Sequence, residues 1–384
     1  MKRWIAKQQA KASLMKVFRN GEIGVNYSYS SNNGFVYPKI LSIRFNYSEK
    51  SLSYFFFLPT GMDPKVIKKK EYCFKQVFGE RIELKGDAKK FTLTVFTANI
   101  PKIIPYDAKR FIEQAKKVKL PIVCGIDMNG QDVVYDMVEN PHLLISGETG
   151  SGKSTQLRSI LSSLIEYKSP DRLKMFLCDL KRSEFPIFRS VNHVEGVFVK
   201  PADMLPMLNY LREETIIRGD LLDAHAVAHI DDLPNPPHYI VLCIDEFALL
   251  KKEKKIWNLV EEISSIGRAL GIYLILSVLR PDRNILDGVL KNNLTVRMGF
   301  KCADLINSRI IGTPGSEKLK ENGRMLLKLK GQDLKEIQAP YLDIDKAKEL
   351  LKNHKSPINK DPNKGPSKRS DDPEIIDAIF EVLD

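Results

Sequence analysis

The chain has 384 residues, of which 43% are hydrophobic and 28% are charged, and it carries a formal net charge of +12. This length suits one large domain with a smaller one, and the apolar content is enough for a substantial packed core. The sequence excludes a membrane-spanning helix, because no segment approaches the ~18–20 uninterrupted apolar residues that cross a bilayer. It also excludes a disulfide scaffold, since the five cysteines stand alone without CxxC pairs.

The basic charge favours an anionic partner, either nucleic acid or an acidic membrane face. A basic protein without such a partner would have the same composition, so charge leaves this alternative open. The N-terminus is too polar for a signal peptide, and the lone cysteines are typical of reduced thiols. We therefore expect a cytoplasmic protein.

Residues 1–20 form a basic N-terminal arm with six Lys or Arg residues and no acidic residue. Apolar residues such as Trp4 and Phe18 are interspersed among the basic ones. A basic amphipathic segment of this kind is suited to contact with DNA or with anionic lipid. Lipid contact would recruit the chain to the inner face of the membrane. The alternative is a solvated terminus without a partner, and the sequence leaves both interpretations open.

Residues 21–118 are expected to form a small α+β module with a helical connector. Asp63 and Pro64 are typical of a helix start, and apolar residues at helical spacing predict a helix over Asp63–Phe78. The connector is predicted as a helix over Asp107–Lys119. β-branched and aromatic runs predict strands at Val36-Tyr37, Ile40–Phe45, Leu52–Leu58 and Phe91–Phe96.

In residues 119–346, strand-like apolar runs alternate with longer helical stretches such as Ser154–Tyr167. This alternation predicts an α/β fold with a central, mainly parallel sheet. Residues 347–384 are poor in core residues, and their Lys, Pro, Asn and Ser content predicts a basic flexible linker followed by a short C-terminal helix. The predicted strands of the sheet are His142–Ser146, Lys174–Cys178, Tyr239–Ile244, Ile272–Ser277 and Thr295–Phe300.

The strongest motif is a glycine-rich run between a predicted strand and a predicted helix. Its glycines let successive backbone N–H groups turn toward phosphates, where a Cβ would obstruct them. We expect Lys153 to reach the β- and γ-phosphates of ATP and the Ser154 hydroxyl to ligate Mg²⁺. The N-terminus of the following helix adds its dipole. The run, predicted to bind nucleotide, is Gly147-Glu148-Thr149-Gly150-Ser151-Gly152-Lys153-Ser154-Thr155.

A second motif, Asp245-Glu246, follows the buried strand predicted at Tyr239–Ile244. We expect Asp245 to hold Mg²⁺, directly or through water, and Glu246 to orient and deprotonate the attacking water. An acid at Glu246 favours hydrolysis over a nucleotide-triggered switch or a kinase. The least active alternative is a nucleotide-binding scaffold that does not hydrolyse, in which Glu246 has no catalytic role.

Arg268 lies just before the strand predicted at Ile272–Ser277. Its guanidinium is a candidate for neutralising charge on the γ-phosphate, either in its own subunit or across an interface. The alternative is an ordinary arginine on a helix surface.

Two basic clusters follow the carboxyl ends of predicted strands, where functional loops gather in parallel sheets. One interpretation is contact with nucleic-acid phosphate, and the other is a solvated surface. The clusters are Lys181-Arg182 and Lys251, Lys252, Lys254 and Lys255.

The motifs belong to a longer ordered set over about Leu120–Leu342. The set resembles the FtsK/SpoIIIE-type DNA translocases of the FtsK–HerA superfamily. This resemblance implies a RecA-like P-loop NTPase that assembles as a homo-hexameric ring and moves double-stranded DNA through its pore. ATP would bind between subunits, which makes Arg268 a candidate for sensing phosphate in trans. The matching segments are Leu120–Gly130, Asn140–Gly147, Cys178–Phe185, Gly267–Leu274, Arg280-Pro281, Asn307–Ile310, Gly315–Leu319 and Gly323–Leu326.

Departures from that family bear on function. Leu279 stands where the family has a glutamine before Arg280-Pro281, so either the coupling of hydrolysis to movement differs or a neighbour such as Ser277 substitutes. The cell-division translocases carry membrane helices and a C-terminal winged-helix module, and we expect neither here. The small module, with Tyr54–Pro59 and Gly79–Ile82, is more similar to FtsK-type proteins of conjugative elements and plasmids.

The resemblance thus implies an ATP-driven DNA translocase that acts as a coupling protein, delivering relaxase-bound DNA to a secretion channel. An alternative of the same class is a translocase for plasmid or chromosome partitioning or for replication. An alternative of another class is a protein-export ATPase, since related motors drive some secretion systems. Those motors typically carry several tandem ATPase domains, whereas this chain has one such motif.

Overall fold

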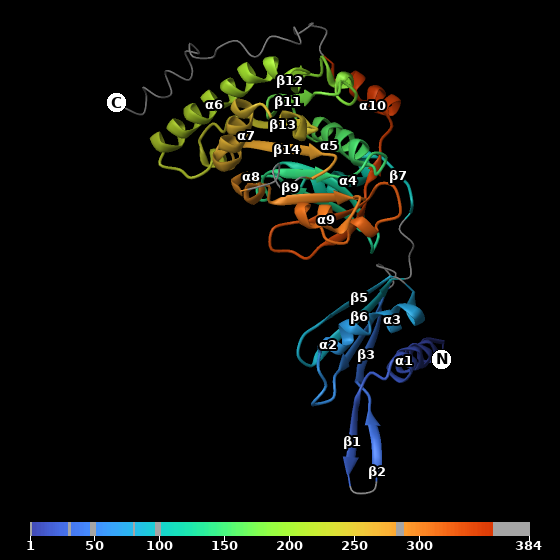
Figure 1. Ribbon diagram of the computed structural model, residues 1–384. Helices are drawn as coiled ribbons and strands as arrows, with labels where there is room; N and C mark the ends of the chain where they lie inside the picture. The colour runs from blue at the N-terminus through green and yellow to red at the C-terminus, as the bar shows by residue number, and fades with distance from the viewer. Residues whose placement is uncertain are drawn as a thin grey trace. The chain divides into compact units, whose positions relative to one another are not determined.

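The computed structural model (Figure 1) divides the chain into two units, and each is described by itself. The small unit comprises Met1–Ile100 with Met128–Gln131, and the large unit comprises Pro101–Asp127 with Asp132–Asp384. The first residues of the flexible linker predicted over 347–384 belong instead to helix α10 (Ile344–Leu351), where Ala347 and Leu351 are buried. The rest of that prediction, from position 356 onward, lies outside the described residues. The structure describes residues 2–29, 32–46, 51–79, 81–96, 101–281 and 288–355.

The small unit is built on a four-stranded antiparallel sheet in the order β3-β4-β6-β5. The single helix predicted over Asp63–Phe78 is two shorter ones, α2 and α3, which meet at Lys70. The elements are α1 (Lys2–Asn20), β1 (Val25–Tyr29), β2 (Asn32–Val36), β3 (Lys39–Asn46), β4 (Ser51–Phe57), α2 (Lys65–Lys69), α3 (Glu71–Phe78), β5 (Ile82–Gly86) and β6 (Lys90–Phe96).

Helix α1, which covers the predicted basic arm, packs into the core of the small unit. Leu14 and Phe18 are fully buried. The ring of Phe18 meets that of Phe56 at a centroid distance of 5.2 Å and that of Phe74 at 6.2 Å, both edge-to-face. Such pairs stabilise a core beyond their area burial. The apolar face of α1 is therefore used by the fold of its own unit, whereas Trp4 at the start of the helix stays exposed.

The large unit contains a ten-stranded sheet in the order β12-β11-β13-β14-β10-β15-β16-β17-β8-β9. The strands from β12 to β15 run parallel, which confirms the predicted α/β fold with a mainly parallel sheet. From β16 to β9 the sheet continues antiparallel, an extension that the sequence did not predict. The strands are β8 (Pro121–Asp127), β9 (Asp132–Asp136), β10 (Leu143–Ser146), β11 (Leu173–Asp179), β12 (Val194–Phe198), β13 (Tyr239–Asp245), β14 (Ile272–Val278), β15 (Val296–Phe300), β16 (Arg324–Lys328) and β17 (Lys335–Gln338).

Helices cover both faces of this sheet. The connection from β10 through α5 to β11 runs toward one edge, and the connections through α6 and α7 run back the other way. Because right-handed crossovers in opposite directions lie on opposite faces, α5 covers one face and α6 with α7 the other (Figure 1). The remaining elements include β7 (Ile104–Pro105) and β18 (Pro340–Tyr341); the helices are α4 (Ala108–Ala115), α5 (Lys153–Tyr167), α6 (Pro201–Ala224), α7 (Lys254–Ile266), α8 (Gly288–Asn293), α9 (Leu305–Ile311) and α10 (Ile344–Leu351).

Central strands of the sheet are buried on both faces. Every residue of β13 and of β14 is buried, as expected for parallel strands covered by helices on both sides. All five cysteines are buried free thiols. None of the helices in the described part of the chain has the length and apolar content needed to cross a bilayer. The parallel strands direct their carboxyl ends to one edge of the sheet, where the predicted motifs lie.

Candidate functional site

The glycine-rich loop follows β10 and runs into the first turn of α5. Gly150 and Gly152 have φ angles of +81° and +109°, which L-residues with a side chain rarely adopt. A Cβ on Gly147 would lie 2.5 Å from Cβ of Phe300, and a Cβ on Gly152 would lie 2.7 Å from Cα of Gly323. Glycine is therefore required by the backbone conformation at two positions and by close neighbours at two.

Contacts with distant segments hold this loop in place. The amide of Gly323 donates to the carbonyl of Ser151 at 2.8 Å, and the amide of Glu148 donates to the carbonyl of Lys301 at 2.9 Å. The Glu148 carboxylate also pairs with the Lys301 ammonium at 3.2 Å. Hydrogen bonds to the segment after β15 and to the segment before β16 thus hold the backbone of the glycine-rich loop.

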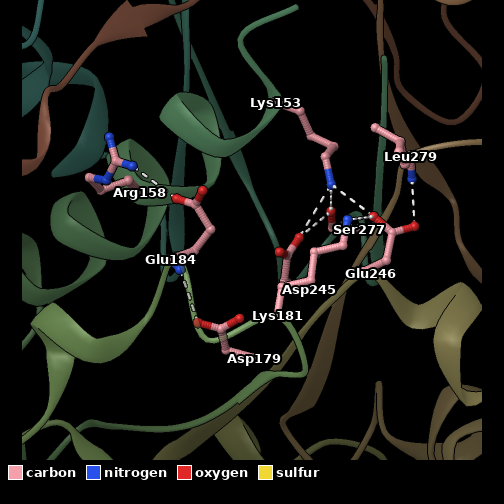
Figure 2. Close-up of polar contacts among 9 residues, drawn as sticks. All are labelled: Lys153, Arg158, Asp179, Lys181, Glu184, Asp245, Glu246, Ser277 and Leu279. Carbon is pink, nitrogen blue, oxygen red and sulfur yellow. Dashed lines mark hydrogen bonds and ion pairs between the residues drawn. The ribbon is translucent and has the colours of Figure 1, made fainter. Parts of the chain in front are cut away.

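Lys153 is the centre of a buried polar network (Figure 2). Its side chain is 8% exposed, and its Nζ donates to Ser277 Oγ at 2.6 Å and to Asp245 Oδ1 at 3.3 Å. The Ser277 hydroxyl in turn donates to the same Asp245 oxygen at 2.8 Å. The three residues come from α5, β14 and β13, which meet because the parallel strands end at a common edge.

Glu246 stands next to this network and is held from two sides. Its backbone is left-handed, with φ 53° and ψ 54°, where the chain turns out of β13. Oε1 accepts a hydrogen bond from the backbone amide of Leu279 at 3.0 Å. Oε2 lies 2.8 Å from Nζ of Lys181 and 3.8 Å from Nζ of Lys153. The Leu279 contact uses the main chain, so it does not depend on the missing glutamine side chain.

The loop after β11 is fixed at its base by Asp179. Its Oδ2 accepts hydrogen bonds from the amides of Glu184 and Phe185 at 2.9 and 3.0 Å. Glu184 pairs with Arg158 of α5 at 2.9 Å, which ties the loop to the helix that follows the glycine-rich run. The other oxygen of Asp179 is buried without a partner among the described residues, and Asp179 lies beside Asp245 in the sheet register.

The other predicted residues differ in their exposure and in their position on the sheet. Thr149 is exposed, and Ser154 and Thr155 are partly buried in the first turn of α5. Arg268 is exposed and precedes β14. It therefore lies at the side of the sheet where the parallel strands begin (the amino edge), whereas the glycine-rich loop lies where they end (the carboxyl edge). Arg182 is exposed at the loop after β11. Four exposed lysines follow Glu246, two of them before α7 and two in its first turn: Lys251, Lys252, Lys254 and Lys255.

The site fits a nucleotide with magnesium. Gly150, with its positive φ, faces open space at the tip of the loop, and the Ser151 hydroxyl is buried without a partner in the described part of the chain. Both features suit a loop whose polar groups turn toward a phosphate. No group of three or more His, Cys, Asp or Glu side chains that could hold a metal occurs among the described residues. Proteins usually bind Mg²⁺ through one or two carboxylates together with substrate phosphates, and Asp245 places one carboxylate beside Lys153 of the loop.

Two contacts of the site were not predicted from the sequence. Besides being a candidate DNA contact, Lys181 pairs through its ammonium with Glu246. Ser277 was noted as a substitute for the missing glutamine, and the structure places it between Lys153 and Asp245. Sequence position could have indicated both contacts, because Lys181 follows β11 and Ser277 lies near the end of β14, and these two strands flank β13 in the parallel sheet.

Comparison with known proteins agrees with this geometry. Residues 108–236 match the FtsK/SpoIIIE family, a range that contains the glycine-rich loop and ends before Asp245. The chain is 35% identical over 226 residues to DNA translocase FtsK of Borreliella burgdorferi, covering 54% of this chain and 28% of that protein. It is 32% identical over 267 residues to DNA translocase FtsK of Haemophilus influenzae, covering 60% and 50%. The chain thus spans half or less of the length of these relatives.

Two solved structures are similar over larger parts of the fold. The conjugation coupling protein TcpA of pCW3, in monomer form with ATPgS, is 25% identical, with a TM-score of 0.61, and the match covers 90% of this chain and 99% of that one. The cytoplasmic domain of the type VII secretion ATPase EccC of Thermomonospora curvata is 24% identical, with a TM-score of 0.57, covering 71% and 34%. The second likeness shows the fold alone.

Replacing Gly152 with alanine tests whether the loop cradles phosphate. We expect the G152A chain to bind ATP at least about tenfold more weakly, because the Cβ meets the backbone of Gly323 and the φ angle disfavours alanine. Binding is measured by titration with a fluorescent ATP analogue in the presence of Mg²⁺. The matched control is Gly219→Ala in α6, where an added Cβ meets nothing within 4 Å. Equal affinity of G152A and the unmodified chain would contradict the cradle.

Proposed function

We propose that this chain is an ATPase that moves double-stranded DNA. The proposal is supported by the match of residues 108–236 to the FtsK/SpoIIIE family and by the similarity to DNA translocases FtsK over 54–60% of the chain. The observation that carries the proposal is the buried network of Lys153, Ser277 and Asp245, with Glu246 beside it, at the glycine-rich loop. A cation, a metal-ligating carboxylate and a base at one edge of a parallel sheet form the set that phosphoryl transfer to water requires.

Each residue has a defined part in this proposal. The amides of the loop 147–155 and the N-terminus of α5 hold the phosphates of ATP, and Lys153 pairs with their charge. Ser154 and Asp245 hold Mg²⁺, which neutralises charge that develops on the phosphates. Glu246 orients a water molecule and takes its proton. Ser277, bonded to Lys153 and Asp245, keeps both at the correct spacing.

Arg268 completes the site from a neighbouring subunit in our proposal. It lies at the amino edge of the sheet, whereas Lys153 lies at the carboxyl edge, so the two residues of one chain do not face the same nucleotide. A ring in which the amino edge of one subunit faces the carboxyl edge of the next brings them together. We therefore infer a homo-hexamer that encloses the duplex, with ATP bound between subunits.

Among translocase roles, we favour a coupling protein for conjugative transfer, with a relaxase and a secretion channel as partners, at the cytoplasmic face of the membrane. The support is the likeness to TcpA, which extends over 90% of this chain and therefore includes its small unit. Partitioning or replication of DNA is the alternative within the class. Protein export is not favoured, because the likeness to the secretion ATPase EccC, at 24% identity, supports the fold alone.

The E246Q variant tests whether Glu246 is the base in ATP hydrolysis. Glutamine cannot take a proton from water, so we expect the ATPase rate to fall roughly 10²–10⁴-fold while ATP affinity is kept. Phosphate release and binding of the fluorescent analogue measure the two quantities. Hydrolysis by E246Q at the rate of an active unmodified chain would contradict the role of Glu246 as the base. Absence of hydrolysis in both chains would leave the nucleotide-binding scaffold.

In the host element, the same variant separates the translocase roles. We expect the frequency of conjugative transfer to fall to background while the element is inherited stably by daughter cells. Normal transfer combined with increased loss at division would instead favour partitioning.

Mixing two inactive variants tests the position of Arg268. Chains with Arg268→Ala and chains with Lys153→Ala are each expected to hydrolyse little ATP, and the mixture to regain activity, since interfaces with an intact Lys153 and an intact Arg268 form. The control mixture is Lys153→Ala with Glu246→Gln, whose lesions lie on the same side of the interface and do not complement. No recovery in a mixture that elutes as a hexamer would contradict a role in trans.

A further inference from the structure

Lys181 connects a solvent-exposed loop to the candidate catalytic carboxylate. Its Nζ lies 2.8 Å from Oε2 of Glu246, across 65 positions of sequence (Figure 2). The two side chains differ in environment, because that of Lys181 is 42% exposed and that of Glu246 is 6% exposed. Lys181 is thus accessible to a partner in solution, whereas Glu246 is buried in the candidate site.

The base of the loop that carries Lys181 is fixed by hydrogen bonds and an ion pair, and its tip is exposed. Asp179 binds the amides of Glu184 and Phe185, and Glu184 is tied to Arg158. Between these anchors, the residues from 181 to 183 are exposed. An anion that approaches the tip meets the ammonium of Lys181 without displacing the loop itself.

The pair with Lys181 also sets the direction of the Glu246 carboxylate. With Oε1 bonded to the Leu279 amide and Oε2 to Lys181, the carboxylate is held by a donor on each oxygen. A carboxylate that must turn toward water has to leave at least one of them. Of the two donors, the backbone amide is fixed in the sheet edge, and the lysine side chain is the one that is free to swing into solvent.

We propose that Lys181 is a positioning residue that restrains Glu246 until a phosphate of duplex DNA competes for its ammonium. Lysine binds phosphate as a flexible point charge, and a partly exposed ion pair is weak enough for a polyanion to displace. Departure of Lys181 leaves Glu246 with the Leu279 amide on Oε1 and with the longer, 3.8 Å contact between Oε2 and Nζ of Lys153, so that Oε2 can turn to take a proton from water. DNA contact at the loop tip thereby raises the rate of hydrolysis. This inference rests on the proposed function, and it assigns the coupling of DNA binding to ATP hydrolysis to the side chain of Lys181.

The variant K181M tests the restraint, because methionine keeps an unbranched stem and removes the charge. We expect its ATPase rate without DNA to rise about fivefold, a change that the loss of a partly exposed ion pair supports. With saturating duplex DNA its rate is expected to match that of the unmodified chain, so the stimulation by DNA falls toward onefold. Phosphate release is measured at saturating ATP, and fluorescence anisotropy confirms that DNA is bound.

Two further variants keep the test specific. Lys181→Arg preserves the charge, and we expect it to retain low DNA-free activity and stimulation by DNA. Lys348→Met removes an exposed lysine that pairs with Asp345 at 3.0 Å in α10, and it is expected to behave like the unmodified chain.

The outcomes separate this inference from the proposed function. A DNA-free rate of K181M equal to or below that of the unmodified chain overturns the restraint, and a fall shows that Lys181 assists hydrolysis instead. Unchanged stimulation by DNA in K181M overturns the competition step. An unmodified chain whose ATPase ignores duplex DNA overturns the proposed function and the trigger, and the restraint is then judged by the DNA-free rate of K181M alone.

Discussion

The buried ammonium of Lys153 is the group on which the candidate site depends. A cation taken out of water is costly unless it is paired and hydrogen-bonded. Here Asp245 and Ser277 supply the partners, at 3.3 and 2.6 Å. Both stand at the ends of neighbouring parallel strands, so the sheet that forms the core also sets the spacing of the charges. In the mechanism that we propose, Lys153 exchanges these partners for a phosphate, which leaves Asp245 available as a metal ligand.

The parts of the site that the sequence predicted are those encoded locally. The glycine-rich loop needs only its own residue types between a strand and a helix, and Asp245-Glu246 needs only its place after a buried strand. Alternation of apolar runs with helical stretches predicted the parallel part of the sheet for the same reason. The antiparallel extension escaped prediction because β9, β16 and β17 are short and carry no clear alternation.

The rest depends on contacts between distant residues, which no local pattern encodes. Lys181 and Glu246 are 65 positions apart, and a lysine at the tip of a loop has the same appearance in sequence whether it binds DNA or a carboxylate. An amphipathic helix such as α1 likewise suits lipid, DNA or a protein core, and the contacts of Phe18 with Phe56 and Phe74 show that its apolar face packs in a protein core. The leucine side chain at position 279 cannot replace the hydrogen bonds of the family glutamine, yet the backbone amide of Leu279 donates a hydrogen bond to Glu246.

The central claim is that binding of duplex DNA and hydrolysis of ATP are coupled in this chain. The most direct measurement is the rate of phosphate release by the purified, unmodified chain as duplex DNA is titrated at saturating ATP and Mg²⁺. Our account predicts a low rate without DNA that rises and saturates with duplex concentration, and that shifts to higher DNA concentration as salt increases, because phosphate contacts are screened and exchanged for counterions. A rate that is the same at every DNA concentration would contradict it.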